Sequence, residues 1–272
     1  MLEKQITSAR GKTSYWIQKN SLPETETLVF LPGLSANHHL FDEQIAYFSD
    51  RHTVLVWDAP AHGQSRPYKD FSYANLAEEL KTILDAEGLS SVILIGQSAG
   101  GFVSQSFIAR YGKQVKGFVS IGSCPYGTGY YSKSDLFWLK QTKWMLSLFP
   151  DNLLRWTIIR MCNKTEKGRN NMRMQLADYE RTELCTLLYQ GFAGFIPEIH
   201  DLQIPCPVCL IVGKYDKTGK VMLYNKAWHK QEAYPLHIIK NAAHNANSDQ
   251  PELVNSLIEA FIRSLSLHKA KG

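Results

Sequence analysis

The chain lacks any apolar run long enough to cross a bilayer. No segment of about 18 consecutive apolar residues occurs among its 272 residues. The first residues, Met1 to Gln5, carry charge and no apolar core, so no secretory signal is expected. These absences predict a cytoplasmic protein with no membrane span.

Cysteine is scarce and odd in number. The five residues are Cys124, Cys162, Cys185, Cys206 and Cys209. Without a secretory signal, an odd count favours reduced thiols over a disulfide framework. Cys206 and Cys209 match C-x-x-C, but no second ligand pair lies at zinc-binding spacing. Because Cys209 begins the apolar run 209–212, we expect a buried strand residue there and no metal site.

A large excess of charge of either sign is also lacking. The net charge is +5, from 30 Lys and Arg against 25 Asp and Glu, and no long basic run occurs. This pattern predicts no nucleic-acid partner. The apolar share of 44% is enough for a globular chain with a large core.

The most informative feature present is a G-x-S-x-G motif, which spans 96–100. It directly follows the apolar run 92–95 and precedes a predicted helix. A sharp turn from strand to helix would lift the Ser98 hydroxyl clear of its neighbours, and Gly96 and Gly100 would leave room for that turn. The alternative is a glycine-rich turn with an idle serine. The flanking pattern favours a nucleophile.

Apolar runs alternate with amphipathic segments along most of the chain. We expect strands near 15–17, 27–31, 52–57, 91–95, 115–121, 208–212 and 237–240, and helices near 41–48, 73–87, 99–111 and 251–265. This alternation predicts an α/β fold with a mostly parallel, doubly wound sheet. Ligands bind such sheets at the carboxyl ends of the strands, where every motif described here lies.

One segment interrupts the alternation. Residues 126–198 contain no predicted strand, and they hold 12 aromatic residues in 73 positions against 19 in the other 199. The aromatic side chains either pack a helical layer on the sheet or form the apolar wall of a substrate pocket; we favour the pocket. Trp138 and Trp144 are candidates for that wall, and the polar stretch 163–171 is a candidate flexible connection. We expect a core domain made of 1–125 and 199–272 and a helical cap of 126–198.

A serine nucleophile needs a base and an acid that orients it. His244 lies in a loop between a late strand and the final helix, and Asp216 follows the strand that ends near Val212. The order Ser98, Asp216, His244 therefore predicts a catalytic triad. No carboxylate follows the strand near 115–121 until Asp135, so the acid is not expected there. The alternatives are an aspartate that only caps a turn and a surface histidine.

Two backbone amides are predicted to hold an oxyanion. The amide of Ala99 begins the helix after the nucleophile, and the amide of Leu34 follows Pro32 and Gly33 in an early loop. The neighbouring pair His38-His39 is expected to begin a helix or lie in a loop, because adjacent residues rarely bind one ion together.

These motifs, with the segments 58–65 and 213–216, make the chain resemble the α/β-hydrolase-fold superfamily over residues 28–265. The resemblance implies a single-chain serine hydrolase with a helical cap inserted after the sixth core strand. Two positions differ from the usual pattern of the family and make assignment to a subfamily less specific. Pro32-Gly33 stands where the family usually has His-Gly, and Ala243 stands where it usually has Gly. The serine argues against the branches whose nucleophile is an aspartate.

The resemblance implies hydrolysis of a small-to-medium apolar carboxylic ester, thioester or lactone through an acyl-enzyme, with no cofactor. Carbon–carbon bond hydrolysis and cofactor-free perhydrolysis use the same groups and stay open. A ligand receptor or signalling partner with slow turnover is a further alternative. An aminopeptidase would need a cap carboxylate over Ser98, and the sequence places none of Glu166, Asp178, Glu180 and Glu183 there. The partner is a small-molecule substrate, and the oligomeric state stays open.

Overall fold

The computed structural model describes residues 1–23 and 25–269. Within them, eight strands form one sheet in the order β1-β2-β4-β3-β5-β6-β7-β8. The strands are β1 (Leu2–Ser8), β2 (Gly11–Gln18), β3 (Thr27–Leu31), β4 (Thr53–Trp57), β5 (Val92–Gln97), β6 (Val115–Ile121), β7 (Val208–Gly213) and β8 (Leu236–Ile239). β2 pairs antiparallel with β1 and β4, and every other neighbouring pair is parallel. The predicted α/β fold with a mostly parallel sheet is confirmed.

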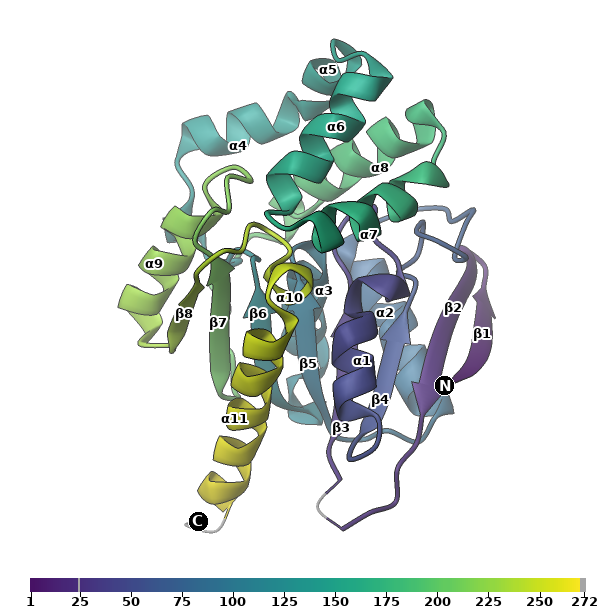
Figure 1. Cartoon of the computed structure of the whole chain (residues 1–272), viewed down its shortest axis with the longest axis vertical. Helices are drawn as coiled ribbons and strands as arrows, with labels where there is room; N and C mark the ends of the chain where they lie inside the picture. Colours follow the sequence, from purple (N-terminus) through teal and green to yellow (C-terminus); the bar gives the residue numbers. More distant parts are fainter. Residues whose placement is uncertain (24, 270–272) are drawn as a thin grey trace.

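Helices cover both faces of the sheet (Figure 1). They are α1 (Asp42–Phe48), α2 (Tyr73–Ala86), α3 (Ala99–Tyr111), α9 (Val221–Glu232), α10 (Ala246–Asp249) and α11 (Pro251–Lys269), with η1 (His38–Phe41) and η2 (Gly112–Gln114) as short 3-10 turns. Alternate strand residues point to opposite faces. In β3, Leu28 and Phe30 pack with α1 and α11, whereas Val29 and Leu31 pack with α2 and α3. Central strands buried on both faces explain the continuous apolar runs in the sequence.

A helical segment is inserted between β6 and β7. It contains η3 (Thr128–Tyr130), α4 (Lys133–Lys140), α5 (Thr142–Ser147), α6 (Asp151–Cys162), α7 (Glu166–Ala177), α8 (Arg181–Gly194) and η4 (Ile196–Glu198). The insert lies over the end of the sheet at the top of Figure 1. The predicted insertion of helices after the sixth strand is confirmed. We call residues 126–198 the cap below.

The structure corrects two local expectations. β1 was not predicted, because it is an edge strand whose mostly exposed side chains leave no apolar run. The stretch 163–171 is not a flexible connection: α7 begins at Glu166, and Asn163 is completely buried. Polar composition was misleading there because the polar side chains bond to one another and to the core.

Candidate active site

Ser98 lies at the junction between β5 and α3, in a strained backbone conformation. Its φ is 50° and its ψ is −116°, a region that non-glycine residues rarely adopt. The Ser98 amide donates a 2.8 Å hydrogen bond to the Ile121 carbonyl at the end of β6. The neighbouring strand therefore holds the turn in place, and the predicted sharp turn from strand to helix is present at the serine.

The two glycines of the motif are needed for close backbone contact. A Cβ atom on Gly96 would lie 2.5 Å from the Gly100 carbonyl oxygen, and one on Gly100 would lie 1.8 Å from the Leu31 carbonyl oxygen. Real Cβ atoms do not approach backbone so closely. Side chains at these positions would push β5, α3 and β3 apart, which is the steric reason anticipated for Gly96 and Gly100.

His244 and Asp216 form a buried pair. The His244 Nδ1 atom lies 2.8 Å from the Asp216 Oδ2 atom, and their side chains are 5% and 0% exposed. The other carboxylate oxygen, Asp216 Oδ1, accepts a 2.8 Å bond from the Thr218 amide. The carboxylate thus holds the ring by Nδ1 and leaves Nε2 for other chemistry. The structure brings together the two residues that the sequence paired.

Ser98 and the His244–Asp216 pair meet the same short segment after β6. Ser98 bonds to Ile121, and a Cβ atom on the next residue, Gly122, would lie 3.2 Å from His244 Nδ1 and 3.5 Å from Asp216 Oδ2. On the other side, Gln97 Nε2 donates to the His244 carbonyl at 3.3 Å. No hydrogen bond joins Ser98 Oγ to the His244 ring within residues 1–23 and 25–269. Catalytic hydrogen bonds often tighten only when substrate binds.

The proposed oxyanion donors flank Ser98. A Cβ atom on Gly33 would lie 3.0 Å from the Ser98 Cβ atom, so the loop that carries the Leu34 amide touches the serine. Ala99 is the first residue of α3, and amides in the first turn of a helix have no intrahelical acceptor. Both amides therefore belong to segments that adjoin Ser98.

Sequence reasoning missed the residues that bind the histidine loop to the cap. Asp249 Oδ2 accepts from the Ala243 amide at 2.9 Å and from the Lys164 amide at 2.8 Å. Asn245 donates from its amide to the Cys162 carbonyl at 2.8 Å and from Nδ2 to Asn163 Oδ1 at 3.1 Å. In the sequence, only their closeness to His244 points to Asp249 and Asn245. Their bonding partners in the cap lie about 80 residues earlier in the chain, so no local pattern reveals the contact.

Other candidate side chains make contacts of their own, apart from Ser98, Asp216 and His244. Asp135 Oδ1 pairs with Lys220 Nζ at 2.6 Å, and Glu183 pairs with Arg66 at 2.8 Å. Glu166, Asp178 and Glu180 are exposed. Among the described residues, no group of three or more His, Cys, Asp or Glu side chains is arranged to hold a metal ion.

The two adjacent histidines act separately. His38 Nδ1 lies 2.8 Å from Asp58 Oδ1, and its ring stacks on Trp16 with centroids 3.6 Å apart. His39 faces Asp42 instead, with 3.1 Å between Nδ1 and Oδ2. Both belong to η1, so the predicted helix start is confirmed.

The cysteines are free thiols in the described chain. Burial raises the pKa of Cys206 and of Cys209 to about 12, which keeps both thiols protonated near neutral pH. Cys209 lies inside β7 and is 3% exposed. The prediction of a buried strand residue at Cys209 is confirmed.

The aromatic side chains of the cap divide into two groups. Phe195 is 3% exposed and stacks on Phe102 of α3, with centroids 4.5 Å apart and an interplanar angle of 9°. Trp138 and Trp144 are 54% and 60% exposed, so neither forms a closed wall over Ser98. A cavity of about 270 Å³ lies between α6 and α7, and one of about 460 Å³ lies near Arg66; neither lining includes Ser98, Asp216 or His244.

Among the described residues, no helix has the length and apolarity that crossing a bilayer requires.

Comparison with known proteins assigns the fold. A family model described as alpha/beta hydrolase fold matches residues 26–251. The chain is 23% identical to 3-oxoadipate enol-lactonase 1 of Acinetobacter baylyi over 278 aligned residues, which cover 96% of this chain and 97% of the relative. An esterase from Thermogutta terrifontis superposes with a TM-score of 0.76 at 16% identity, covering 97% of this chain and 99% of the other. An N-acyl homoserine lactone degrading enzyme has a TM-score of 0.78 at 17% identity, over 95% of this chain and all of its own.

Proposed function

Because this chain belongs to the alpha/beta hydrolase fold family, we propose that it is a serine hydrolase with Ser98 as its nucleophile. Its substrate would be a small-to-medium, apolar carboxylic ester, thioester or lactone. The single observation that carries the proposal is the 2.8 Å contact between the buried His244 and Asp216, beside a serine whose φ is 50°.

The proposed reaction has two halves. In the first, His244 Nε2 takes the Ser98 proton while Oγ attacks the carbonyl carbon, and the amides of Leu34 and Ala99 stabilise the oxyanion. The oxyanion collapses, the bond to the alcohol, thiol or ring oxygen breaks, and His244 returns its proton to that leaving group. In the second half, His244 activates water, which attacks the acyl-enzyme and releases the acid.

Asp216 has an orienting role in this proposal. Its Oδ2 accepts from His244 Nδ1, which favours the ring tautomer with a free Nε2 and stabilises the imidazolium that forms during attack. No step requires a metal or an organic cofactor.

The surroundings of the serine support an apolar substrate. Leu34 reaches the cap, where a Cβ atom on Gly191 would lie 2.2 Å from the Leu34 Cδ1 atom. Phe102 and Phe195 stack between the core and the cap. Two of the similar proteins act on lactones according to their names, which places lactones in the substrate panel beside open-chain esters.

A chain-length series tests the proposal. The kcat/KM of wild type and Ser98→Ala is measured with p-nitrophenyl esters from acetate to decanoate and with γ- and δ-lactones. We expect wild type to prefer one apolar acyl length, and the variant to lose activity on every substrate. Negligible turnover by wild type across the panel would reject the hydrolase and favour a triad-bearing receptor.

A further inference from the structure

Large apolar side chains are exposed over the outer helices of the cap. The helices α4 and α5 contain no buried residue at all. Eight apolar side chains on or beside α4, α5 and α6 are 37% to 63% exposed: Phe137, Trp138, Trp144, Met145, Leu148, Phe149, Leu153 and Trp156. We call these eight residues the apolar patch. Large exposed apolar side chains gathered on neighbouring helices mark an interaction surface.

The positive charge of the protein is concentrated in the same segment. Residues 133–173 carry nine Lys and Arg against three Asp and Glu, a net charge of +6. The other 231 residues carry 21 basic and 22 acidic side chains, a net charge of −1. The net positive charge of the chain therefore comes from the segment that also carries the apolar patch.

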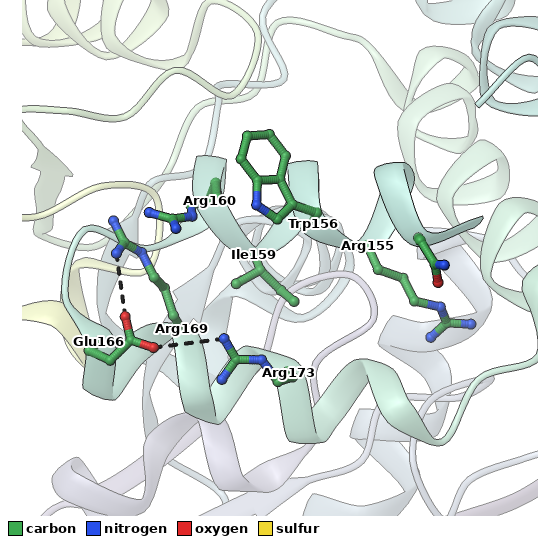
Figure 2. Close-up of a pocket in the computed structure, with 8 residues that line it drawn as sticks. Arg155, Trp156, Ile159, Arg160, Glu166, Arg169 and Arg173 are labelled. Atoms are coloured by element: carbon green, nitrogen blue, oxygen red, sulfur yellow. Dashed lines mark hydrogen bonds and ion pairs between the residues drawn. The ribbon is translucent and has the colours of Figure 1, made fainter. Parts of the chain in front are cut away.

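A pocket of about 270 Å³ lies in the groove between α6 and α7 (Figure 2). Its lining consists of Asn152, Arg155, Trp156, Ile159, Arg160, Glu166, Arg169 and Arg173. Four arginines therefore face one glutamate. Trp156 belongs both to this lining and to the apolar patch, so the two features are continuous.

The arginines of the pocket differ in how far their charge is neutralised. Arg155 is fully paired, because its Nε donates to Asp151 at 2.9 Å and its Nη2 donates to the Tyr179 carbonyl at 2.6 Å. In contrast, Glu166 is shared between Arg169 at 3.5 Å and Arg173 at 3.7 Å. Both distances exceed those of good charge-assisted bonds. The dashed lines in Figure 2 mark the two pairs.

Arg160 lies at the same pocket without an acid. It makes no ion pair within the described residues, and its guanidinium carbon lies 5.7 Å from the Trp156 ring centroid. Arg160, Arg169 and Arg173 thus carry two more positive charges than Glu166 offsets. A planar guanidinium group can donate two hydrogen bonds to two oxygens of one phosphate, so the donors and the charge of this pocket suit a phosphate group.

We propose that the outer face of the cap docks on an anionic phospholipid surface, with lipid phosphates in the pocket of Arg160, Arg169 and Arg173 and the apolar patch in the adjoining acyl region. Tryptophan and basic side chains with long apolar stems are the residues that suit such an interface. Each basic residue near the surface adds to the attraction to anionic lipid.

The charge distinguishes this occupant from a second copy of the chain. A two-fold contact places the same patch on both subunits. It would therefore bring two segments of net charge +6 face to face and leave their guanidinium groups without anions. An anionic lipid surface supplies both the missing charge and an apolar phase.

Vesicle co-sedimentation tests the proposal with the full chain. The probes are vesicles of phosphatidylglycerol and phosphatidylcholine at 3:7, and vesicles of phosphatidylcholine alone. The charge variant is Arg160→Gln with Arg173→Gln; Arg169 is kept because its Nε bonds the Asn163 carbonyl. The matched control is Lys226→Gln with Lys230→Gln, two exposed lysines on α9.

The apolar variant is Trp144→Ser with Leu148→Ser. Its control is Leu223→Ser with Leu253→Ser, which are 58% and 46% exposed on α9 and α11. Circular dichroism and thermal melting of every variant verify that it is folded. We expect the charge variant to bind the anionic vesicles roughly tenfold more weakly or worse, and the controls to bind as wild type does. The apolar variant should also lose binding.

Several results would overturn the proposal. Equal binding of wild type to neutral and anionic vesicles would show that charge does not drive binding. If the lysine control lost as much binding as the charge variant, the pocket would have no specific part in it. Binding of inorganic phosphate without any vesicle binding would assign the pocket to a free anion. Self-association that the apolar variant abolishes, without vesicle binding, would assign the patch to a second copy.

Discussion

Asp249 holds Thr165 by two hydrogen bonds, from the threonine amide at 2.8 Å and from its hydroxyl at 2.7 Å. The same carboxylate accepts the amide of Ala243, the residue before His244, at 2.9 Å. One buried side chain therefore joins the α6–α7 junction of the cap to the loop that carries the proposed catalytic base. The position of the cap and the position of His244 are physically linked at this point.

Replacing Asp249→Asn should lower both stability and activity. An amide has one acceptor oxygen in place of two, so buried backbone amides lose partners at a cost of about 1–3 kcal/mol. We expect the melting temperature to fall by several degrees and kcat to fall more than KM rises, because His244 would be less well positioned. The exposed Asp42→Asn on α1 loses the same charge and should change neither value.

Ser98→Ala should remove catalysis while keeping the fold. We expect kcat to fall by roughly three or more orders of magnitude, with residual rate from the oxyanion donors alone. The melting temperature should stay close to that of wild type, since the side chain lost is small. Full activity in this variant would assign the nucleophile elsewhere.

Asp216→Asn should cut kcat severely, by roughly 10⁴-fold, because an amide favours the imidazole tautomer with the proton on Nε2. Asp135→Asn is the matched control, since Asp135 follows the neighbouring strand but pairs with Lys220. Steady-state kinetics of both variants compare the two positions. Near-wild-type activity for Asp216→Asn, together with a large loss for Asp135→Asn, would move the acid to the other strand.

Replacing two aromatic residues of the cap should change the free energy of unfolding by very different amounts. Phe195→Ala removes a ring that is 3% exposed and stacked on Phe102, so it should cost about 3–5 kcal/mol of unfolding free energy. Trp144→Ala removes a ring that is 60% exposed and should change stability by less than about 0.5 kcal/mol. Urea unfolding measures both, and similar losses would contradict the described packing.

Glu87→Gln should make stability less dependent on pH in the acid range. Burial alone would raise the Glu87 pKa, but hydrogen bonds from Lys4, Tyr15 and Lys19 outweigh it and lower the pKa from 4.5 to about 2. A depressed folded-state pKa stabilises the protein above about pH 4.5, and that stabilisation is lost as the pH falls toward 2.

The urea midpoints of wild type and Glu87→Gln should therefore differ most near pH 7 and converge as the pH falls from about 5 to about 3. A difference that stays constant over this range would show that the effect of the substitution is not linked to ionisation of Glu87.

The sequence predicted those parts of the site that local patterns encode. Ser98 lies between an apolar run and a helix, Asp216 follows the buried strand β7, and His244 follows the last strand β8, so position along the chain indicated their meeting point. The core strands were recognisable because burial on both faces makes them continuously apolar. β1 has one exposed face at the sheet edge and left no such pattern.

The docking of the cap could not be predicted in the same way. Asp249 and Asn245 bond to residues about 80 positions earlier, and no local pattern encodes such a contact. The polar stretch after Asn163 suggested a flexible connection because its buried bonding partners are distant in sequence. Trp138 and Trp144 suggested a pocket wall because composition does not tell an inward side chain from an outward one.

The most direct test of the account is to identify the residue that a fluorophosphonate probe modifies. Intact-mass analysis of labelled protein, followed by peptide mapping, locates the phosphonylated serine. The account predicts one label per chain, on Ser98, with loss of labelling in His244→Ala because the serine would lack its base. A label on any other serine, or no label in a folded protein that hydrolyses esters, would contradict it.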